Sequence, residues 1–562
     1  MIKRQILFIF FILFYILGTF SLAMGGTKTN DKVTVYIVPA ITDNKILPES
    51  SISSSCISDT IYIRASPGEF EPASFVIRSN RNVNSLKVES TKLTGNNGVI
   101  QSSNVDIRTV KCWYQGNYGN YINSAGRYLT PELLLKDDSL IKVTDDTISR
   151  GDVSNPKGRN YLKLTNGSYI DISNSAPQSQ SLIIPISQRP VRDADNLQPV
   201  NIESTKNKQF WITVNVPNNT NEGNYSGIIY LKSNDKTITK IKLNLQVLPI
   251  DLPKSNLEYS IYYRGMITDK GSISSEEKTI EQFTAENKNM LNHGVTNPTV
   301  YHTSSDNVLK QVLSIRNNVG IDNTNLYYLG LWIWDNSKIS YYKTLATTYG
   351  VSNLYAYGPD EQDMKNAKSQ SQMTAVHNAG GKVLNAQSPE QADSVANILD
   401  LAVVQGVPNV TLANKYHSYG HKIFSYADPQ VYPEYPRLFR MNYGLLLWQN
   451  DYDGAMDYAY QHSFGDIWND FDDGTCRDHV FAYPTMNGVI DTIQWEGFRE
   501  GVDDVRYLTA LQNTIITANA QGKDTTEAEN YLANLKNSDL SSQDLDVVRS
   551  QMANYTIELH SN

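Results

Sequence analysis

From residue 257 to residue 492 the sequence alternates between short apolar, aromatic runs and longer stretches with helical spacing. LEYSIYYRG precedes SEEKTIEQFTAENKNMLNHG, for example, and NLYYLGLWIW precedes ISYYKTLATTYG. Strands that alternate with helices are typical of a parallel sheet, because parallel neighbours need a crossover connection. About eight such rounds predict a (β/α)8 barrel of the TIM type over residues 257–492. A doubly wound open sheet is the alternative, but no glycine-rich phosphate loop follows any of these runs.

Residues 33–252 have a different pattern. Apolar and polar residues alternate with period two in segments such as VTVYIVPA, TIYIRAS and YSGIIYLKS, and Asn, Gly and Pro interrupt them. This pattern predicts an N-terminal antiparallel β-sandwich domain. Residues 113–205 are less regular, and we expect them to form long loops on that domain. The two prolines of LPIDLPKSN, residues 248–256, indicate a linker.

The C-terminal residues 493–562 are predicted to be helical. Apolar residues recur at three- and four-residue spacing and predict one buried stripe, formed by Trp495, Phe498, Val502, Val505 and Leu508. Arg499, Asp503 and Arg506 have the spacing of helix ion pairs, which we expect on the other faces. Two further helices are expected near 525–535 and 542–559. The predicted fold class is therefore multidomain α/β plus all-β: a sandwich, a barrel and a small helical unit.

Residues 1–24 have the layout of a secretory signal peptide. Lys3 and Arg4 precede an apolar stretch that small residues follow. The stretch is also long enough to cross a bilayer, so an uncleaved N-terminal anchor remains an alternative. We expect a secreted or cell-surface protein that meets a membrane only through this segment.

Composition narrows the range of partners. The net charge is −9 and no basic block occurs, which argues against binding to nucleic acid or to anionic membrane surfaces. The 35 tyrosines and 7 tryptophans, together with many side-chain amides, suit contact with a glycan substrate. The oligomeric state is left open.

The sequence predicts no cofactor and no metal. Three cysteines exclude a disulfide framework and a cysteine-rich zinc site, although Cys56 and Cys112 could either pair or remain free. His417 and His421 are four residues apart, but no acid lies nearby at ligand spacing. The acidic segment at 469–478 is either an irregular loop or a calcium site.

The segment NLYAYGPDEQD, residues 353–363, places two neighbouring carboxylates, Asp360 and Glu361, after the fourth predicted barrel strand. A solvated turn would explain Gly, Pro and Asp at this point. However, barrel enzymes build their active sites where the βα loops converge, at the carboxyl ends of the strands. We therefore interpret Asp360 and Glu361 as a catalytic pair.

The adjacency of the two acids limits the chemistry. Glycosidases normally place two carboxylates about 5–9.5 Å apart on either side of the glycosidic bond. Neighbours in sequence cannot easily flank that bond. They suit a substrate-assisted hydrolase, in which one acid protonates the leaving oxygen and the other orients an acetamido group of the substrate.

Here the chain resembles glycoside hydrolase family 123 and the related proteins with a domain of unknown function 4091. The resemblance rests on the aromatic run ending in Asp360-Glu361, on the sandwich before it, and on FAYPTMNGVIDTIQWEGFREGVDDVRYLTAL at 481–511. It implies hydrolysis of terminal β-linked N-acetylgalactosamine, with Asp360 polarising the acetamido group and Glu361 acting as acid and then base. Relatives often have Asp-Glu-Pro, whereas Gln362 follows the pair here.

Residues near the predicted strand ends are candidates for lining a sugar pocket, although each could instead pack in a core. They are Arg264, Trp332, Trp334, Tyr357, Tyr426 and Tyr460. We expect the Tyr426 phenol to contact the acetamido carbonyl. Asp428 offers a second mechanism, as a protein nucleophile with Glu361 as the acid. A non-catalytic surface protein that binds carbohydrate or serves a structural role is the alternative from another class.

Overall fold

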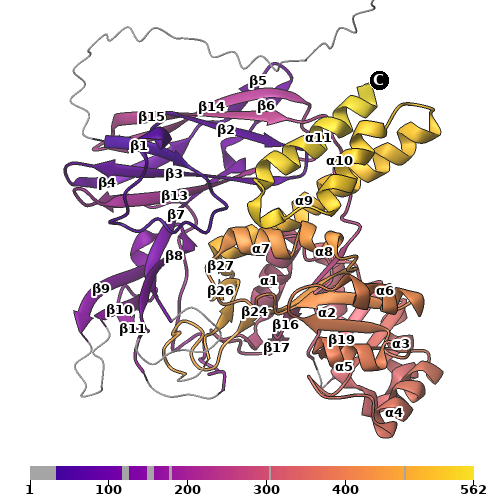
Figure 1. The fold of residues 1–562 in the computed structure, drawn as a ribbon. Helices are drawn as coiled ribbons and strands as arrows, with labels where there is room; N and C mark the ends of the chain where they lie inside the picture. The colour runs from indigo at the N-terminus through magenta and orange to yellow at the C-terminus, as the bar shows by residue number, and fades with distance from the viewer. Residues whose placement is uncertain are drawn as a thin grey trace, which may run out of the picture.

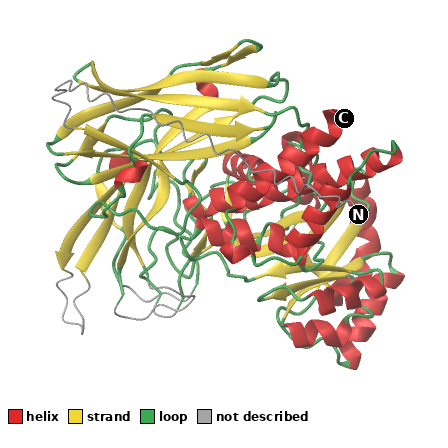
Figure 2. Cartoon of the chain, turned by 45° about the horizontal axis from the view of Figure 1, so that its top comes forward, coloured by secondary structure: helices red, strands yellow, loops and turns green. Residues whose placement is uncertain are grey.

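The computed structural model describes residues 33–116, 126–147, 157–175, 180–302, 305–473 and 476–561. Figures 1 and 2 show strands gathered on one side of the molecule and a mixture of strands and helices on the other. The predicted signal or anchor segment, residues 1–24, lies outside the described residues.

Two sheets form the N-terminal sandwich. The first has the order β1 (Val33–Val38), β3 (Phe70–Ser79), β13 (Asn207–Asn215), β7 (Val105–Gln115) and β8 (Tyr128–Leu135). The second has the order β12 (Val200–Ile202), β4 (Val83–Ser90), β14 (Gly223–Ser233), β15 (Lys236–Val247) and β2 (Thr60–Ala65), with β5 (Leu93–Gly95) and β6 (Gly98–Ile100) beside β14. Pairing is antiparallel apart from β15 with β2, so the predicted antiparallel sheets are confirmed.

The sandwich core follows the period-two pattern of its strands. Alternate residues of both sheets point inward and pack into one apolar cluster. Phe75 and Phe210, on neighbouring strands, stack with ring centroids 5.0 Å apart. Burial of these alternating residues fixes the register of each strand, because a slip by one residue would expose the whole apolar set.

The prediction of long loops across residues 113–205 is wrong in part. A separate antiparallel sheet lies here, formed by β9 (Ile141–Thr147), β10 (Lys157–Lys163) and β11 (Tyr169–Asp171). Strand β8 also falls in this range, and it pairs with β7 through a register shift next to Cys112. Short strands and an irregular register obscure the period-two signal on which a sequence prediction depends.

The second half of the chain contains a parallel sheet. Its order is β16 (Glu258–Tyr263), β24 (Gly454–His462), β23 (Lys422–Tyr426), β22 (Leu401–Gln405), β21 (Lys382–Gln387), β20 (Asn353–Tyr357) and β19 (Asn325–Trp332), and β25 (His479–Val480) pairs antiparallel with β24. The helices of this half are α1 (Ile280–Asn292), α2 (Asp306–Val319), α3 (Ile339–Thr347), α4 (Ala367–Asn378), α5 (Pro389–Val395), α6 (Val410–Ser418), α7 (Pro436–Asn442) and α8 (Leu445–Gln449). The alternation of strands and helices is confirmed.

A complete eight-stranded barrel is not confirmed. The segment PTVYH, residues 298–302, lies between α1 and α2, where the alternation requires a strand, but it forms only one bridge, between Val300 and Tyr328. Its backbone N–H groups still reach both neighbouring strands, from Thr299 to Ile261 O at 3.1 Å and from Val300 to Tyr327 O at 2.9 Å. Pro298 has no N–H, so it cannot donate to a ladder at this point.

The curled parallel sheet has two differently packed faces. Ile261 and Ala356 face outward into the apolar core shared with the helices. Tyr262 and Tyr357, each the next residue along its strand, face the interior with other tyrosines. This alternation follows from the pleat of the strands, and it gives the interior an aromatic lining.

Short elements complete this half of the molecule. The strands β17 (Met266–Ile267) and β18 (Glu277–Lys278) pair in parallel, and β26 (Ala482–Pro484) pairs antiparallel with β27 (Val489–Asp491). Five 3-10 turns lie at Ser54–Cys56, Ser102–Asn104, Asp138–Leu140, Ile333–Lys338 and Leu540–Ser542 within the described ranges.

Three helices end the chain: α9 (Ile493–Ala520), α10 (Thr526–Lys536) and α11 (Leu545–Ser561). Figure 1 shows them next to the sandwich and above α7. The predicted apolar stripe of α9 is confirmed as buried. Across the described residues, no helix is both long enough and apolar enough to span a bilayer.

The charged residues of α9, predicted to lie on faces other than the apolar stripe, are also largely buried. Arg499 and Asp503 are buried, because the sandwich covers this side of the helix. Trp211 of β13 donates to Glu496 at 3.0 Å, and Tyr507 donates to Glu69 at 2.8 Å. Arg506 does pair with Asp503, as the spacing predicted, at 2.7 Å. The helix therefore joins the sandwich to the parallel sheet through buried polar contacts.

Candidate active site

Asp360 and Glu361 lie in the turn that follows β20, with both side chains exposed. Gly358 begins this turn, and a Cβ there would lie 2.7 Å from Asn385 Oδ1. Asn385 also donates to the carbonyl of Pro359 at 3.1 Å. The turn is thus fixed against the neighbouring strand β21, and it holds both acids at the carboxyl end of β20.

Asp360 accepts a hydrogen bond from the hydroxyl of Tyr357, the last residue of β20. The Tyr357 ring is buried in the aromatic interior of the sheet. Burial raises the pKa of Tyr357 well above its ordinary value, and the neighbouring Tyr262 and Asp360 raise it further. The phenol therefore keeps its proton and holds one oxygen of Asp360 at the interior side of the turn.

Glu361 is held by a different strand. Tyr426, the last residue of β23, donates from its hydroxyl to Glu361 Oε1 at 3.1 Å. Burial raises the pKa of Tyr426, and the charge of Glu361 adds to that shift. Gln391 of α5 donates to the backbone carbonyl of Glu361 at 3.2 Å. The two neighbouring acids are therefore positioned independently, each by a tyrosine from its own strand.

Neither acid serves as a partner for a basic side chain. Among the described residues, no lysine, arginine or histidine forms an ion pair with Asp360 or Glu361. A structural carboxylate at a turn commonly pairs with a cation or caps a helix. Here both acids instead face the aromatic interior while remaining open to solvent.

Trp332 and Trp334 lie beside the pair, at the end of β19. Their rings stack with centroids 4.7 Å apart and planes 9° from parallel. Trp332 also meets the ring of Tyr357 edge-on at 5.4 Å. Trp334 is 50% exposed, so one large ring face is open to solvent next to the turn that carries Asp360 and Glu361. Such a ring suits the C–H face of a sugar.

Arg264 lies just after β16, at the same end of the sheet. Its guanidinium pairs with Glu276 at 2.5 Å and donates to Tyr458 at 3.4 Å, above the ring of Tyr301. Burial raises the pKa of the Tyr301 phenol well above its ordinary value, and the carboxylate of Asp360 adds to the shift. Arg264 is therefore linked to the surroundings of Asp360 through the phenols of Tyr301 and Tyr458.

Tyr460 does not join the other predicted pocket residues. It is buried in the outer core, and its hydroxyl donates to Asn289 Oδ1 at 3.0 Å. The pairing of β16 with β24 shifts register between Ile261 and Tyr263. This irregularity changes the alternation along β24, so Tyr458 faces the interior in place of Tyr460.

Asp428 follows β23, two residues after Tyr426. Its backbone N–H donates to the Tyr443 hydroxyl at 3.1 Å, and burial raises the pKa of its carboxyl group. Its neighbours include the buried acid Asp457. Within the described ranges, no hydrogen bond or ion pair connects Asp428 with Asp360 or Glu361.

Sequence reasoning missed four interior residues that touch this arrangement: Tyr262, Tyr301, Tyr458 and Gln430. Tyr262 could have been found, because inward and outward residues alternate along a strand. Tyr458 could have been found in the same way, because it lies two residues after the inward-facing Met456 on β24. Gln430 lies in a loop, and its contact depends on how that loop folds back.

One described group has the residue types of a metal site: His293, Asp491 and Glu496. Its carboxylates already have cationic partners, since Arg499 donates to Glu496 at 2.6 Å and Arg108 donates to Asp491 at 3.3 Å. This arrangement favours a hydrogen-bonded ionic network over a cation site.

The remaining metal and cysteine questions concern other segments. The acidic segment at 469–478 includes residues outside the described ranges, and its Asp470 accepts from Arg477 at 2.8 Å. Cys56, Cys112 and Cys476 are free thiols in the structure, so the alternative of a Cys56–Cys112 pair is not realised.

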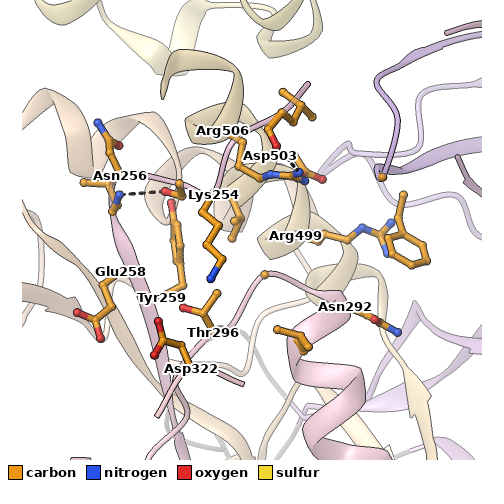
Figure 3. Close-up of a pocket in the computed structure, with 18 of the residues that line it drawn as sticks. Lys254, Asn256, Glu258, Tyr259, Asn292, Thr296, Asp322, Arg499, Asp503 and Arg506 are labelled. Atoms are coloured by element: carbon orange, nitrogen blue, oxygen red, sulfur yellow. Dashed lines mark hydrogen bonds and ion pairs between the residues drawn. The ribbon is translucent and has the colours of Figure 1, made fainter. Parts of the chain in front are cut away.

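A large pocket opens at the opposite end of the sheet (Figure 3). Its volume is about 550 Å³, and it is lined by Glu258 and Tyr259 at the start of β16 and by Lys422 at the start of β23. Arg506 and Asp503 of α9, which form an ion pair, complete one wall. Because parallel strands place their amino and carboxyl ends on opposite sides, this pocket is separate from Asp360 and Glu361.

No family model and no curated protein matches the chain. Among solved structures, a family 123 glycoside hydrolase from Clostridium perfringens, analysed for glycolipid glycan hydrolysis, superposes with a TM-score of 0.61 and 13% sequence identity. The match covers 94% of this chain and 98% of that one.

Two other solved structures match more weakly. An N-acetylneuraminate lyase from Mycoplasma synoviae has a TM-score of 0.27, with 10% identity over 55% of this chain and 98% of that one. A xyloglucanase of family 5 from Bacteroides ovatus has a TM-score of 0.28, with 6% identity over 81% and 99% of the two chains. Both similarities are too weak to indicate a shared fold. The chain therefore shares its overall fold with a family 123 glycoside hydrolase.

Proposed function

We propose that this protein is a glycoside hydrolase that removes terminal β-linked N-acetylhexosamine, and N-acetyl-β-galactosamine first among these sugars. One observation carries the proposal: two adjacent, exposed carboxylates, Asp360 and Glu361, are each held by a separate interior tyrosine at the carboxyl end of β20. The fold shared with a family 123 hydrolase supports it.

The mechanism uses the acetamido group of the substrate as the nucleophile. Glu361 gives its proton to the glycosidic oxygen as the bond to C1 breaks, and the acetamido oxygen forms a new bond to C1. Asp360 orients the acetamido N–H and stabilises the positive charge of the oxazolinium ring. Water then attacks C1 and gives a proton to Glu361, while the ring opens to restore the acetamido group.

The surrounding side chains fit a sugar at this position. The Tyr357 hydroxyl fixes Asp360 so that its other oxygen is free for the substrate. Trp332 and the exposed Trp334 offer a stacking surface beside it. Arg264 with its phenol neighbours bounds the other side. The direct contact of Tyr426 with the acetamido carbonyl, expected from the sequence, remains a proposal, because its hydroxyl faces Glu361 in this structure.

A protein nucleophile is the second mechanism. It would require the carboxylate of Asp428 to reach the anomeric carbon, and within the described ranges no hydrogen bond or ion pair links Asp428 to Asp360 or Glu361. A non-catalytic carbohydrate-binding or structural role is the remaining alternative. It does not explain why two acids face one interior surface without a basic partner among the described residues.

A panel of aryl β-glycosides tests the proposal. We expect turnover of N-acetylgalactosaminide, slower turnover of N-acetylglucosaminide, and at least about a hundredfold less with the matching non-acetylated sugars. The double variant Asp360→Asn, Glu361→Gln serves as the control for contaminating activity. Equal cleavage of acetylated and non-acetylated sugars would point to a protein nucleophile. Binding of the sugars without any turnover would support the non-catalytic role.

We also propose that the protein is exported, on the basis of the charged and apolar residues at 1–24. The domain limits 33–252, 257–492 and 493–562 are retained as part of this proposal, as is the assignment of the C-terminal part to domain of unknown function 4091. Fractionation of expressing cells, followed by N-terminal sequencing of the exported chain, tests whether the segment is cleaved or kept as an anchor.

A further inference from the structure

We propose that Gln391 is a positioning residue for Glu361, and that it acts on the backbone of the turn that carries the two acids; this inference rests on the proposed function. Gln391 is the third residue of α5, and its Nε2 donates to the backbone carbonyl of Glu361 at 3.2 Å. This hydrogen bond couples the helix that follows β21 to the proposed general acid.

The turn has a backbone conformation that its sequence does not favour. The N–H of Gln362 donates to the carbonyl of Pro359 at 3.2 Å, which closes a β-turn with Asp360 and Glu361 at its two central positions. Glu361 has a φ of +50°, whereas a β-turn with a positive φ at its third residue usually has glycine or asparagine there. The turn therefore needs restraints from outside itself to keep Glu361 in this conformation.

Side-chain amides from the next strand hold the two ends of the turn. Asn385 of β21 donates to the carbonyl of Pro359 at 3.1 Å, and Gln387, the last residue of β21, donates to the carbonyl of Gln362 at 3.3 Å. Asn385 and Gln387 are both buried, so the strand that carries them provides a rigid support. These two amides fix the first and last residues of the turn, whereas the residue before the last is held by α5.

The hydrogen bond to the carbonyl of Glu361 controls where its side chain points. Rotation about the N–Cα bond of a residue moves its carbonyl and its side chain together, so a fixed carbonyl also fixes the direction of the carboxylate. In this direction Oε1 of Glu361 accepts from Tyr426 at 3.1 Å. Relaxation of φ to a negative value would turn the carboxylate away from Tyr426 and from the glycosidic oxygen, and a misplacement of about 1 Å costs about a hundredfold in rate.

The amide of Gln391 is itself held in one orientation by the helix cap. Its Oε1 accepts from the N–H of Ser388 at 3.1 Å, and its own N–H donates to the Ser388 hydroxyl at 3.3 Å, which together form the capping box of α5. Because the amide oxygen serves the cap, the amide nitrogen is left to serve Glu361. The cap and the hydrogen bond to the turn can therefore be separated by substitution.

Gln391→Met and Ser388→Ala test the proposal as a pair. Each variant loses one hydrogen bond of the capping box, so both melting temperatures should fall by a similar small amount, about 1–2 °C. Only Gln391→Met also loses the hydrogen bond to Glu361. We expect kcat on a poor leaving group to fall about 10–100-fold in Gln391→Met and to stay within about twofold of wild type in Ser388→Ala.

The dependence on the leaving group identifies the role in positioning the acid. The loss in Gln391→Met should be smaller on an activated aryl glycoside, which needs little protonation, and KM should not change. Gln370→Met is a second control. Gln370 of α4 donates in the same way to a backbone carbonyl of the loop after β20, but to that of Lys365, at 3.0 Å. This variant should have wild-type kinetics.

Three outcomes would overturn the proposal. The first is wild-type kinetics in Gln391→Met. The second is an equal loss of kcat in Gln391→Met and Ser388→Ala, which would reduce the role of Gln391 to helix stability. The third is a raised KM with equal losses on every leaving group, which would make Gln391 a substrate contact.

If the wild-type chain cleaves no glycoside, the proposed function fails on its own. A crystal structure of Gln391→Met then tests the positioning of Glu361. Loss of the hydrogen bond between Tyr426 and Glu361 supports it, and an unchanged hydrogen bond overturns it.

Discussion

The hydroxyl of Tyr357 donates a hydrogen bond to the carboxylate of Asp360, three residues further along the same strand and turn. Glu361 instead accepts a hydrogen bond from Tyr426, so the two adjacent acids are positioned by different strands. Substitutions of the two acids should therefore have separable effects.

Glu361→Gln removes the proposed acid. We expect kcat to fall about 10²–10⁴-fold on poor leaving groups. Activated aryl glycosides, whose leaving groups need little protonation, should retain more activity. The measurement is kcat across a series of substituted phenyl glycosides. A loss of the same size along the whole series would contradict the assignment of Glu361 as the acid.

Asp360→Asn should behave differently, because its proposed role is to stabilise the ring that forms from the acetamido group. We expect a loss of about 10²–10³-fold that is similar for good and poor leaving groups. A thiazoline that mimics the intermediate should inhibit the wild type and bind Asp360→Asn more weakly. Inhibition of both proteins with the same constant would exclude this role.

Trp334→Ala tests the stacking surface next to the pair. We expect KM for an oligosaccharide substrate to rise about tenfold, which corresponds to about 1.4 kcal/mol. The kcat on a simple aryl glycoside should change little, because that substrate does not cover the ring. Tyr62→Ala removes another strongly exposed aromatic ring, on β2 of the sandwich, and is the control. Equal effects of the two substitutions would remove Trp334 from the substrate site.

Stability should fall as the pH rises through neutrality. Burial raises the pKa of Glu500 to about 7, and burial together with the charge of Glu434 raises that of Glu132 to about 7. A raised carboxyl pKa means that the folded protein binds the proton more tightly than the unfolded chain. The resulting stability is complete below the ordinary value of 4.5 and is lost as the pH passes 7.

Thermal unfolding between about pH 5 and about pH 8 measures this effect, at roughly 1.4 kcal/mol per pKa unit for each buried group. We expect the melting temperature to decrease across the range. Glu500→Gln should show a shallower decrease, since an amide does not titrate. A flat profile for the wild type would show that these carboxyl groups are not perturbed in this way.

Removal of metal ions should not change turnover, because the proposed chemistry uses only carboxylates and the substrate. Incubation with a chelator, followed by the aryl glycoside assay, checks this. Complete loss of activity that one metal restores would overturn the mechanism, and the group of His293, Asp491 and Glu496 would then be examined for binding.

The arrangement of the fold could be predicted where the periodicity is regular. Alternating strands and helices identified the parallel sheet, and the spacing of apolar residues identified α9. The second barrel strand is not confirmed, because the segment that begins with Pro298 forms only one bridge, between Val300 and Tyr328. The burial of Arg499 and Asp503 could not be predicted either, since the sandwich that covers them is contributed by residues several hundred positions away.

The candidate site could be predicted where its residues lie at the carboxyl ends of strands. Asp360, Glu361, Tyr357 and Tyr426 come together because parallel strands end on one side of the sheet. The prediction that Tyr460 lines the pocket was wrong, because the register shift on β24 turns its side chain toward the outer core. Gln430 has no periodic signal, so its contact could be found only in three dimensions.

The hydrogen bond from Tyr507 to Glu69 joins residues 438 positions apart. Ser66 meets the same hydroxyl at 3.0 Å, so this part of the sandwich surface is completed only by the long helix near the end of the chain. During synthesis the N-terminal strands emerge first, and until that helix is made the Glu69 carboxylate has only the local backbone N–H of Ser66 as a partner. The joining of the two halves therefore has to wait until α9 has been synthesised.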